Sequence, residues 1–289
     1  MVASKPFRSA QGLAPGGPPG ERPLGCEAAV DTVNLSIREI RALLASLRKP
    51  DPALFASLAR DPRATARHLG YSALRKGRSL AANEDIFRDG GIRFLAGADE
   101  AGRGALAGPL VAAAVMFAPG EVVEGANDSK KLTPKRREEL YDEIMGRAES
   151  VSVVFVDAGL IDRWGIQPVN LQALGGAIAG IDDRCQRAIC DHFSPAGCPV
   201  PTFGVPRADE TFQSVAAASI VAKVERDRLM RALHRRFPRY NFAENKGYGT
   251  VEHLRALAAH GPSPFHRLSF SGVLPDDEMS LWESAGAEE

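Results

Sequence analysis

Residues 93–117 read RFLAGADEAGRGALAGPLVAAAVMF, with two apolar segments, 93–98 and 110–117, flanking an acidic, glycine-rich bend. We predict a strand for each apolar segment. Successive side chains of a strand point to opposite faces, so Asp99 and Glu100 serve one site only if the strand breaks at Glu100. Gly102 and Gly104 would make that break inexpensive, because glycine adopts backbone angles that are costly for other residues.

The bend combines groups that suit both a cation and an anion. Asp99 and Glu100 offer carboxylate oxygens, which hard divalent cations prefer. Arg103, between the two glycines, is a donor suited to a phosphate. This pairing is what a metal-dependent reaction on a phosphodiester requires. The alternative is an acidic hairpin turn whose charges are merely solvated.

Two stretches of the sequence resemble the type 2 ribonuclease H family. GADEAGRG at 97–104, followed by Gly108-Pro109, is similar to its first motif, and AAASIVAKVERDR at 216–228 is similar to its second. The resemblance implies the ribonuclease H-like fold over about 94–270, an α/β architecture with a mixed β-sheet flanked by helices. It also implies a two-metal endonuclease, using Mg²⁺ or Mn²⁺, that cuts the RNA strand of RNA/DNA hybrids and single ribonucleotides in duplex DNA. The products would carry 5′-phosphates.

Two further acids are candidates for the same site. Asp191 ends the short apolar strand 188–190, which would bring it to the edge of the first strand; the alternative is an aspartate that starts a turn. Asp227 follows Val224 on the inward face of a long helix, where it would meet a cation or pair with Lys223 and Arg231. In the family pattern this aspartate completes the acidic set. The resemblance therefore implies that the metal-binding and catalytic residues are Asp99, Glu100, Asp191 and Asp227.

Substrate contacts are predicted at a second group of residues. Tyr248 stands between two glycines, where an exposed ring would suit stacking on a sugar or base; the alternative is a ring folded onto the core. The resemblance implies that Tyr248 and the glycine-arginine-glycine bend sense the 2′-hydroxyl, which distinguishes RNA from DNA. It also places a serine and a lysine near the substrate backbone. The implied substrate-binding residues are Gly102, Arg103, Gly104, Ser129, Lys130 and Tyr248.

The sequence departs from the family pattern at two places. His192 follows Asp191 where the family usually has glycine. Thr211 and Phe212 replace a lysine and a serine that usually precede the alanine-rich helix. Neither change removes a candidate metal ligand, so we expect an active but slower enzyme.

The chain divides into four predicted regions. Residues 1–33 form a glycine- and proline-rich disordered arm, 34–90 a helical extension, 91–272 the catalytic domain with helices at its C-terminal end, and 273–289 an acidic tail. Ser36 and Glu39 predict a capping box that begins the extension. Within the catalytic domain we expect further strands at 151–156, 187–191 and 200–204, and helices at 134–147, 168–181 and 214–236.

Composition narrows the class of protein. The chain has 289 residues, 44% of them hydrophobic, and a formal net charge of zero. The longest apolar run, 110–117, is too short to span a membrane, and we read the cysteines as reduced thiols. Basic residues gather on the helix at 214–236. We expect a cytoplasmic monomer that binds nucleic acid and no membrane. Two rival functions stay open, a DNA resolvase or transposase-like nuclease on the same fold and a catalytically impaired hybrid-binding protein.

Overall fold

The computed structural model of the chain describes residues 32–47, 79–89, 91–126 and 129–274, together with single positions between 51 and 74. The predicted arm up to residue 31 and the acidic tail from 275 onward lie outside the described residues. Cys26 lies there too, and the other three cysteines are free thiols. Among the described helices, none has the length and apolar character needed to cross a bilayer.

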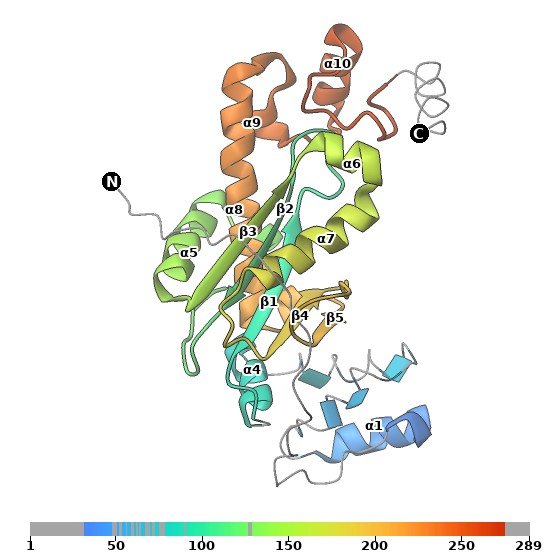
Figure 1. The fold of residues 1–289 in the computed structure, drawn as a ribbon, viewed down its shortest axis with the longest axis vertical. Helices are drawn as coiled ribbons and strands as arrows, with labels where there is room; N and C mark the ends of the chain where they lie inside the picture. Colours follow the sequence, from blue (N-terminus) through green and yellow to red (C-terminus); the bar gives the residue numbers. More distant parts are fainter. Residues whose placement is uncertain are drawn as a thin grey trace, which may run out of the picture.

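A five-stranded mixed sheet forms the centre of the molecule (Figure 1), in the order β3-β2-β1-β4-β5. Its strands are β1 (Leu95–Ala101), β2 (Leu110–Met116), β3 (Ser150–Val156), β4 (Arg187–Asp191) and β5 (Thr202–Val205). The first three pair antiparallel, whereas β1, β4 and β5 run parallel. The predicted mixed sheet is confirmed.

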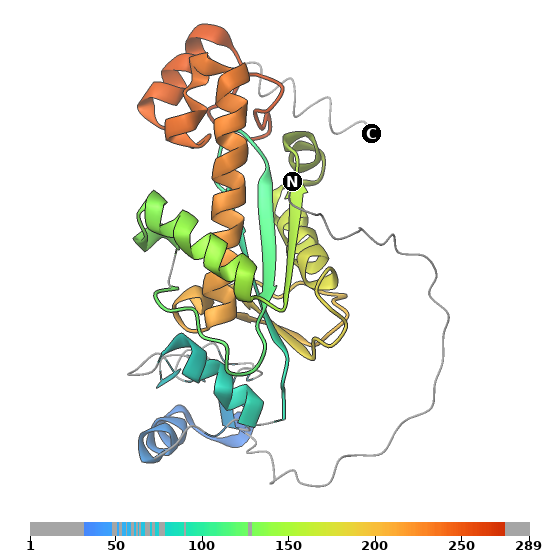
Figure 2. The ribbon, with the colours of Figure 1, turned by 90° about the vertical axis from the view of Figure 1, so that its left-hand side faces the viewer.

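Helices cover both faces of the sheet (Figure 2). One face carries α5 (Pro134–Arg147) and α8 (Gln213–Arg236); the other carries α6 (Ala158–Trp164) and α7 (Ile166–Ala179). Helix α6 was not predicted from the sequence, although Asp157 caps it through its side chain.

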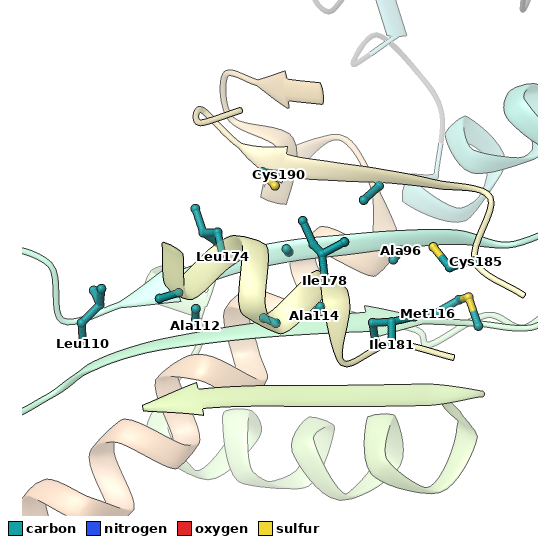
Figure 3. Packing of buried hydrophobic residues seen from close by; sticks show 14 of the residues in the cluster. Ala96, Leu110, Ala112, Ala114, Met116, Leu174, Ile178, Ile181, Cys185 and Cys190 are labelled. Atoms are coloured by element: carbon teal, nitrogen blue, oxygen red, sulfur yellow. The ribbon is translucent and has the colours of Figure 1, made fainter. Parts of the chain in front are cut away.

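Small side chains let the helices lie close to the sheet. On the α7 side, Leu174 and Ile178 pack over the alanines Ala112 and Ala114 of β2 (Figure 3). On the opposite side, the buried alanines at the start of α8 lie against Val111, Ala113 and Val115 of the same strand. Alternation along β2 thus divides the core into two layers.

The C-terminal elements form a helical cap at the far end of α8. It consists of the 3-10 turn η4 (Pro238–Tyr240), α9 (Phe242–Asn245) and α10 (Val251–His260). Met230 and Leu233 of α8 pack with Tyr240, Phe242 and Leu257 in this cap.

The described residues of the N-terminal region lie largely in helices. After the turn η1 (Thr32–Asn34), α1 (Ile37–Ser46) begins with the predicted capping box, in which Ser36 and Glu39 cap each other. A second helix, α4 (Leu80–Asp89), lies beside the start of α8 (Figure 2). Leu74 and Phe55 of this region pack with Leu95 of β1 and Phe212, so the region shares part of its core with the sheet.

Candidate active site

Two acids lie at the carboxyl end of neighbouring parallel strands. The register of β1 and β4 pairs Ala98 with Cys190, so Asp99 and Asp191 are the next residue on each strand. Both follow the same alternation and face the α8 side of the sheet. Asp99 is 7% exposed, and Asp191 accepts a hydrogen bond from the Ala208 amide at 2.8 Å.

Glu100 lies on the other face of β1. Our expectation that the strand breaks at Glu100 is wrong: β1 continues to Ala101, and Glu100 pairs with Ala112 of β2. Asp99 therefore faces α8, where the Ser219 hydroxyl lies close enough to favour its ionised form, whereas Glu100 faces Asn170 of α7. The two acids flank the strand end. Because β4 ends at Asp191, it does not pair with β1 beyond Ala98, and the edge of β1 next to Asp99 and Glu100 is left uncovered by β4.

The three carboxyl groups nonetheless act on one another. Burial, followed by the charges of Glu100 and Asp191, raises the pKa of Asp99 well above its usual value. Burial and the charge of Asp191 raise the pKa of Glu100 to about 7, although Arg103 and Lys130 oppose this. Burial also raises the pKa of Asp191. The fold thus concentrates negative charge at this edge, which favours protons or cations there.

The donor atoms at this edge suit a hard cation. In the part of the chain that the structure describes, no three acidic, histidine or cysteine side chains form a ready-made ligand set. However, Oε2 of Glu100 is buried and has no hydrogen-bond partner among the described residues. Neither polar atom of the fully buried Asn170 amide has a partner there either. Carboxylate and amide oxygens left in this state fit a divalent cation and its bound water.

Asp227 is held differently from the other three acids. Its carboxylate accepts from Lys223 Nζ at 2.7 Å and from Arg137 Nη1 at 3.4 Å, and only 6% of the residue is exposed. The ion pair with Lys223 is one of the alternatives that the helical spacing predicted. Arg231, the other predicted partner, instead pairs with Glu138. The structure therefore brings Asp99, Glu100 and Asp191 together and shows Asp227 in ion pairs.

Ser129 and Lys130 open the short 3-10 helix η2 (Ser129–Lys131) beside the acids. The Ser129 hydroxyl lies 2.9 Å from the Ser219 hydroxyl of α8, and Arg137 Nε donates to the Ser129 carbonyl at 2.9 Å. The charge of Lys130 lowers the pKa of both Glu100 and Asp191. Lys130 is thus a cation next to the acidic edge.

The glycine-arginine-glycine bend follows β1 directly. Gly102 has φ +89°, and a Cβ there would lie 1.9 Å from Arg226 Nε, so only glycine fits. At Gly104 a Cβ would meet nothing within 4 Å, which leaves this point of the bend open. Arg103 donates to Gln167 of α7 at 2.7 Å, and its guanidinium lies 4.6 Å from the Phe193 ring centre.

The loop that carries Tyr248 is fastened to the segment after this bend. The amides of Leu106 and Ala107 donate to the Gly247 carbonyl at 2.8 and 3.2 Å. Arg226 donates to the carbonyls of Ala107, Pro109 and Lys246, and its guanidinium lies 5.4 Å from the Tyr248 ring centre. Tyr248 is 40% exposed, which favours the predicted stacking surface over a ring folded into the core.

Two arginines in this region were not recognised as structural from the sequence. Arg226, one of the basic residues on the helix predicted at 214–236, is fully buried. Arg267 is fully buried as well and donates to the carbonyls of Arg103 and Gly108. Asn170 and Gln167 of α7 were also missed. Asn170 could have been predicted as a site residue, because it is a polar residue on an otherwise apolar face of the helix.

The two departures from the family pattern have structural consequences. His192 has φ +60°, a left-handed conformation that glycine adopts without strain. Thr211 and Phe212 are both buried at the start of α8. Neither side chain is charged, so neither supplies the cation that a lysine would place near the site.

Comparisons with known proteins agree with this fold and these motifs. The family model described as Ribonuclease HII matches residues 96–273. Ribonuclease HII of Geotalea daltonii is 46% identical over 195 residues, covering 68% of this chain and 90% of the relative. Ribonuclease HII of Geobacter sulfurreducens is 47% identical over 183 residues, covering 63% and 84%. The crystal structure of ribonuclease H2 from Pyrococcus horikoshii superposes with a TM-score of 0.56 at 24% identity, covering 68% of this chain and all of that one, and this likeness shows the fold alone.

Proposed function

Because the chain belongs to the ribonuclease HII family, we propose that Asp99, Glu100, Asp191 and Asp227 bind the divalent cations with which it hydrolyses RNA. The chain is a ribonuclease H, an endonuclease that acts on the RNA strand of RNA/DNA hybrids. The observation that carries the proposal for the site is that Asp99, Glu100 and Asp191 lie at one sheet edge, where burial and then the charges of neighbouring acids raise the pKa of Asp99 and of Glu100.

Two cations, Mg²⁺ or Mn²⁺, would activate a water molecule and stabilise the leaving oxygen of the phosphodiester. The protein's own contribution is to hold the carboxylates in place. Asp191 is fixed by the Ala208 amide, and Glu100 presents an oxygen that has no other partner in the described part of the chain. Asp227 would join this set when a cation competes with Lys223 and Arg137 for its oxygens.

The substrate would be recognised along the rim formed by the bend and the Tyr248 loop. The exposed Tyr248 ring and the open backbone at Gly104 lie on two segments that are hydrogen bonded to each other, so both would contact the same sugar. Arg103 and Lys130 would contact phosphates of the substrate. Ser129, whose hydroxyl is hydrogen bonded to Ser219, would hold in place the turn that carries Lys130. We infer that single ribonucleotides in duplex DNA are cut as well, on the 5′ side of the ribonucleotide.

A monomer is sufficient for this chemistry, since all the proposed ligands and substrate contacts come from one chain. The cytoplasmic location expected from the sequence stays a prediction.

A cleavage assay on three labelled duplexes tests the function: one with a single ribonucleotide, one of DNA only, and a four-way junction, each with and without Mg²⁺. Cutting of the first alone, and only with the metal, is expected. Cutting of the junction would favour a resolvase, and binding without cutting would indicate a catalytically impaired protein.

A substitution tests the metal site itself. Asp191→Asn keeps the size of the side chain and its acceptor for the Ala208 amide, but removes a negative ligand. We expect at least ~10²-fold slower cutting with hybrid binding retained, because a metal ion stabilises the transition state by several kcal/mol. Full activity of this variant would remove Asp191 from the site.

A further inference from the structure

Helix α8 starts without a cap of its own. Its N-cap residue is Phe212, which has no side-chain acceptor for the free amides of the first turn. Those amides need acceptors, and in a buried helix start they cannot find them in water. The first residues, Gln213 and Ser214, are buried.

A residue of the N-terminal extension supplies the missing acceptor. Glu84 of α4 is fully buried, and its Oε1 accepts from the Ser214 amide at 2.6 Å, across 130 residues of chain. The neighbouring Asn83 donates to the Thr211 carbonyl at 2.8 Å. The Phe87 ring meets the Phe212 ring edge-on at 5.8 Å. Three residues of α4 therefore hold the start of α8.

These contacts fall on the segment where the sequence departs from its family. Thr211 and Phe212 stand where a lysine and a serine are usual, and both are buried against α4. Helix α4 itself lies before residue 96, outside the part of the chain that the family model matches. The two residues that depart from the family pattern, Thr211 and Phe212, thus contact helix α4 of the N-terminal extension.

The start of α8 is also close to the acidic edge. A Cβ on Gly97 of β1 would lie 2.2 Å from the Val215 amide nitrogen and 2.6 Å from the Ser214 hydroxyl, so α8 rests directly on the strand two residues before Asp99. Further along α8, the Ser219 hydroxyl lies beside Asp99 and contacts Ser129. A shift of the first turn of α8 would displace these groups relative to the carboxylates.

We propose that Glu84 is a positioning residue of the active site: by capping α8 from the N-terminal extension, it holds α8 against β1 so that Ser219 stays beside Asp99. The N-terminal extension then contributes to the geometry of the active site and is not an independent domain. The consequence for turnover depends on the proposed function of Asp99, whereas the cap itself does not.

Three variants test this role in the full chain. Glu84→Ala removes the acceptor. Glu84→Gln keeps an amide oxygen in its place, and it is a close mimic because burial raises the pKa of Glu84. Asp85→Ala is the matched control, since Asp85 is an exposed neighbour that pairs only with Arg88 among the described residues. We expect Glu84→Ala to lower kcat on an RNA/DNA hybrid about tenfold with KM nearly unchanged, Glu84→Gln to recover most of it, and Asp85→Ala to match the wild type.

Hydrogen exchange provides a readout that does not depend on activity. The Ser214 amide should exchange at least ~10-fold faster in Glu84→Ala than in the other two variants. Wild-type kcat in a folded Glu84→Ala protein, or equal loss in the Ala and Gln variants, would overturn the positioning role. Slow exchange at Ser214 in Glu84→Ala would overturn the cap itself, even if the wild type proved unable to cut hybrids.

A fourth variant covers the case in which Glu84→Ala does not fold. Asn83→Leu keeps a similar shape and removes only the bond to the Thr211 carbonyl. A several-fold fall in kcat with unchanged KM supports the proposal, and unchanged kcat contradicts it.

Discussion

At the residue scale, Asn170 and Glu100 place buried polar atoms next to each other without a hydrogen bond. The Asn170 amide is close enough to lower the pKa of Glu100, yet its two polar atoms and Glu100 Oε2 have no partner among the described residues. Leaving such a group unpaired costs about 1–3 kcal/mol. A chain that keeps this cost at an acidic edge gains something there, and we ascribe the gain to cation binding.

Asn170→Leu separates stability from function. Leucine has a similar shape and no unpaired polar atoms. The metal-free variant should therefore be more stable than the wild type, with a free energy of unfolding about 1 kcal/mol higher. Its cutting rate should fall about tenfold, and half-maximal activity should need more Mg²⁺. Chemical denaturation and a Mg²⁺ titration measure both. Gln172→Leu, at an exposed position of the same helix, is the control. Lower stability together with normal activity would mean that Asn170 has only a structural role.

His192 gives a prediction about strain. Its φ of +60° costs a non-glycine residue about 1–2 kcal/mol, and its exposed side chain loses little packing if removed. His192→Gly should therefore raise the free energy of unfolding by about 1 kcal/mol while hybrid cleavage persists. His260→Gly in α10 should do the opposite, because glycine destabilises a helix. If both substitutions destabilise the protein, the strain at His192 is compensated by contacts of its side chain.

At the element scale, the bend after β1 and the Tyr248 loop behave as one unit. Arg226 and Arg267 are fully buried and donate only to backbone carbonyls of these segments among the hydrogen bonds described. Burying a guanidinium is costly unless it is well hydrogen bonded, so these contacts fix the loops together. The predicted recognition of the 2′-hydroxyl by both segments depends on that rigidity.

Gly247→Ala tests this coupling. Gly247 has φ +81°, and a Cβ there would lie 2.2 Å from the Ala107 carbonyl oxygen, so alanine must push the Tyr248 loop away from the bend. Gly261→Ala is a matched control, since Gly261 also has positive φ (+67°) but open space around its Cβ. We expect cleavage at a single ribonucleotide to fall more than ~10-fold in Gly247→Ala and to change little in Gly261→Ala. Equal effects would show that only backbone strain matters.

At the scale of the whole molecule, the sequence predicted the elements better than the contacts between them. Apolar runs and capping signals located the strands and the helices α1, α5, α7 and α8. The position of Asp191 beside Asp99 followed from the ends of the two strands alone. The predicted break at Glu100 was wrong. Because Glu100 lies at the end of β1, it interacts with Asp191 from the opposite face of the sheet without a break in the strand. The structural roles of Glu84, Arg226 and Arg267 could not be predicted. Their hydrogen-bond partners are backbone atoms that lie 20 or more residues away along the chain.

The pH dependence of stability tests whether the acids form one charged centre. Burial and the charge of Asp191 raise the pKa of Glu100 from 4.5 to about 7, so the folded state holds this proton more tightly than the unfolded state. The associated stability is present below pH 4.5 and is lost as the pH rises through 7. Buried His253 and His266, whose pKa values are lowered by burial, act in the opposite direction as the pH falls below 6.5. The measurement must therefore be a difference between two variants that share both histidines.

Glu100→Gln removes the titrating group and keeps the shape of the side chain. Without metal, its free energy of unfolding should match that of the wild type near pH 4.5 and exceed it by on the order of 1 kcal/mol at pH 8, about 2–4 °C in Tm for a domain of this size. Added Mg²⁺ should stabilise the wild type and thereby reduce or reverse the difference at pH 8, because a cation that binds only the folded state shifts the equilibrium toward it. Thermal unfolding at the two pH values, with and without Mg²⁺, measures both effects. A difference that is constant with pH would mean that Glu100 does not share a charged centre with Asp99 and Asp191.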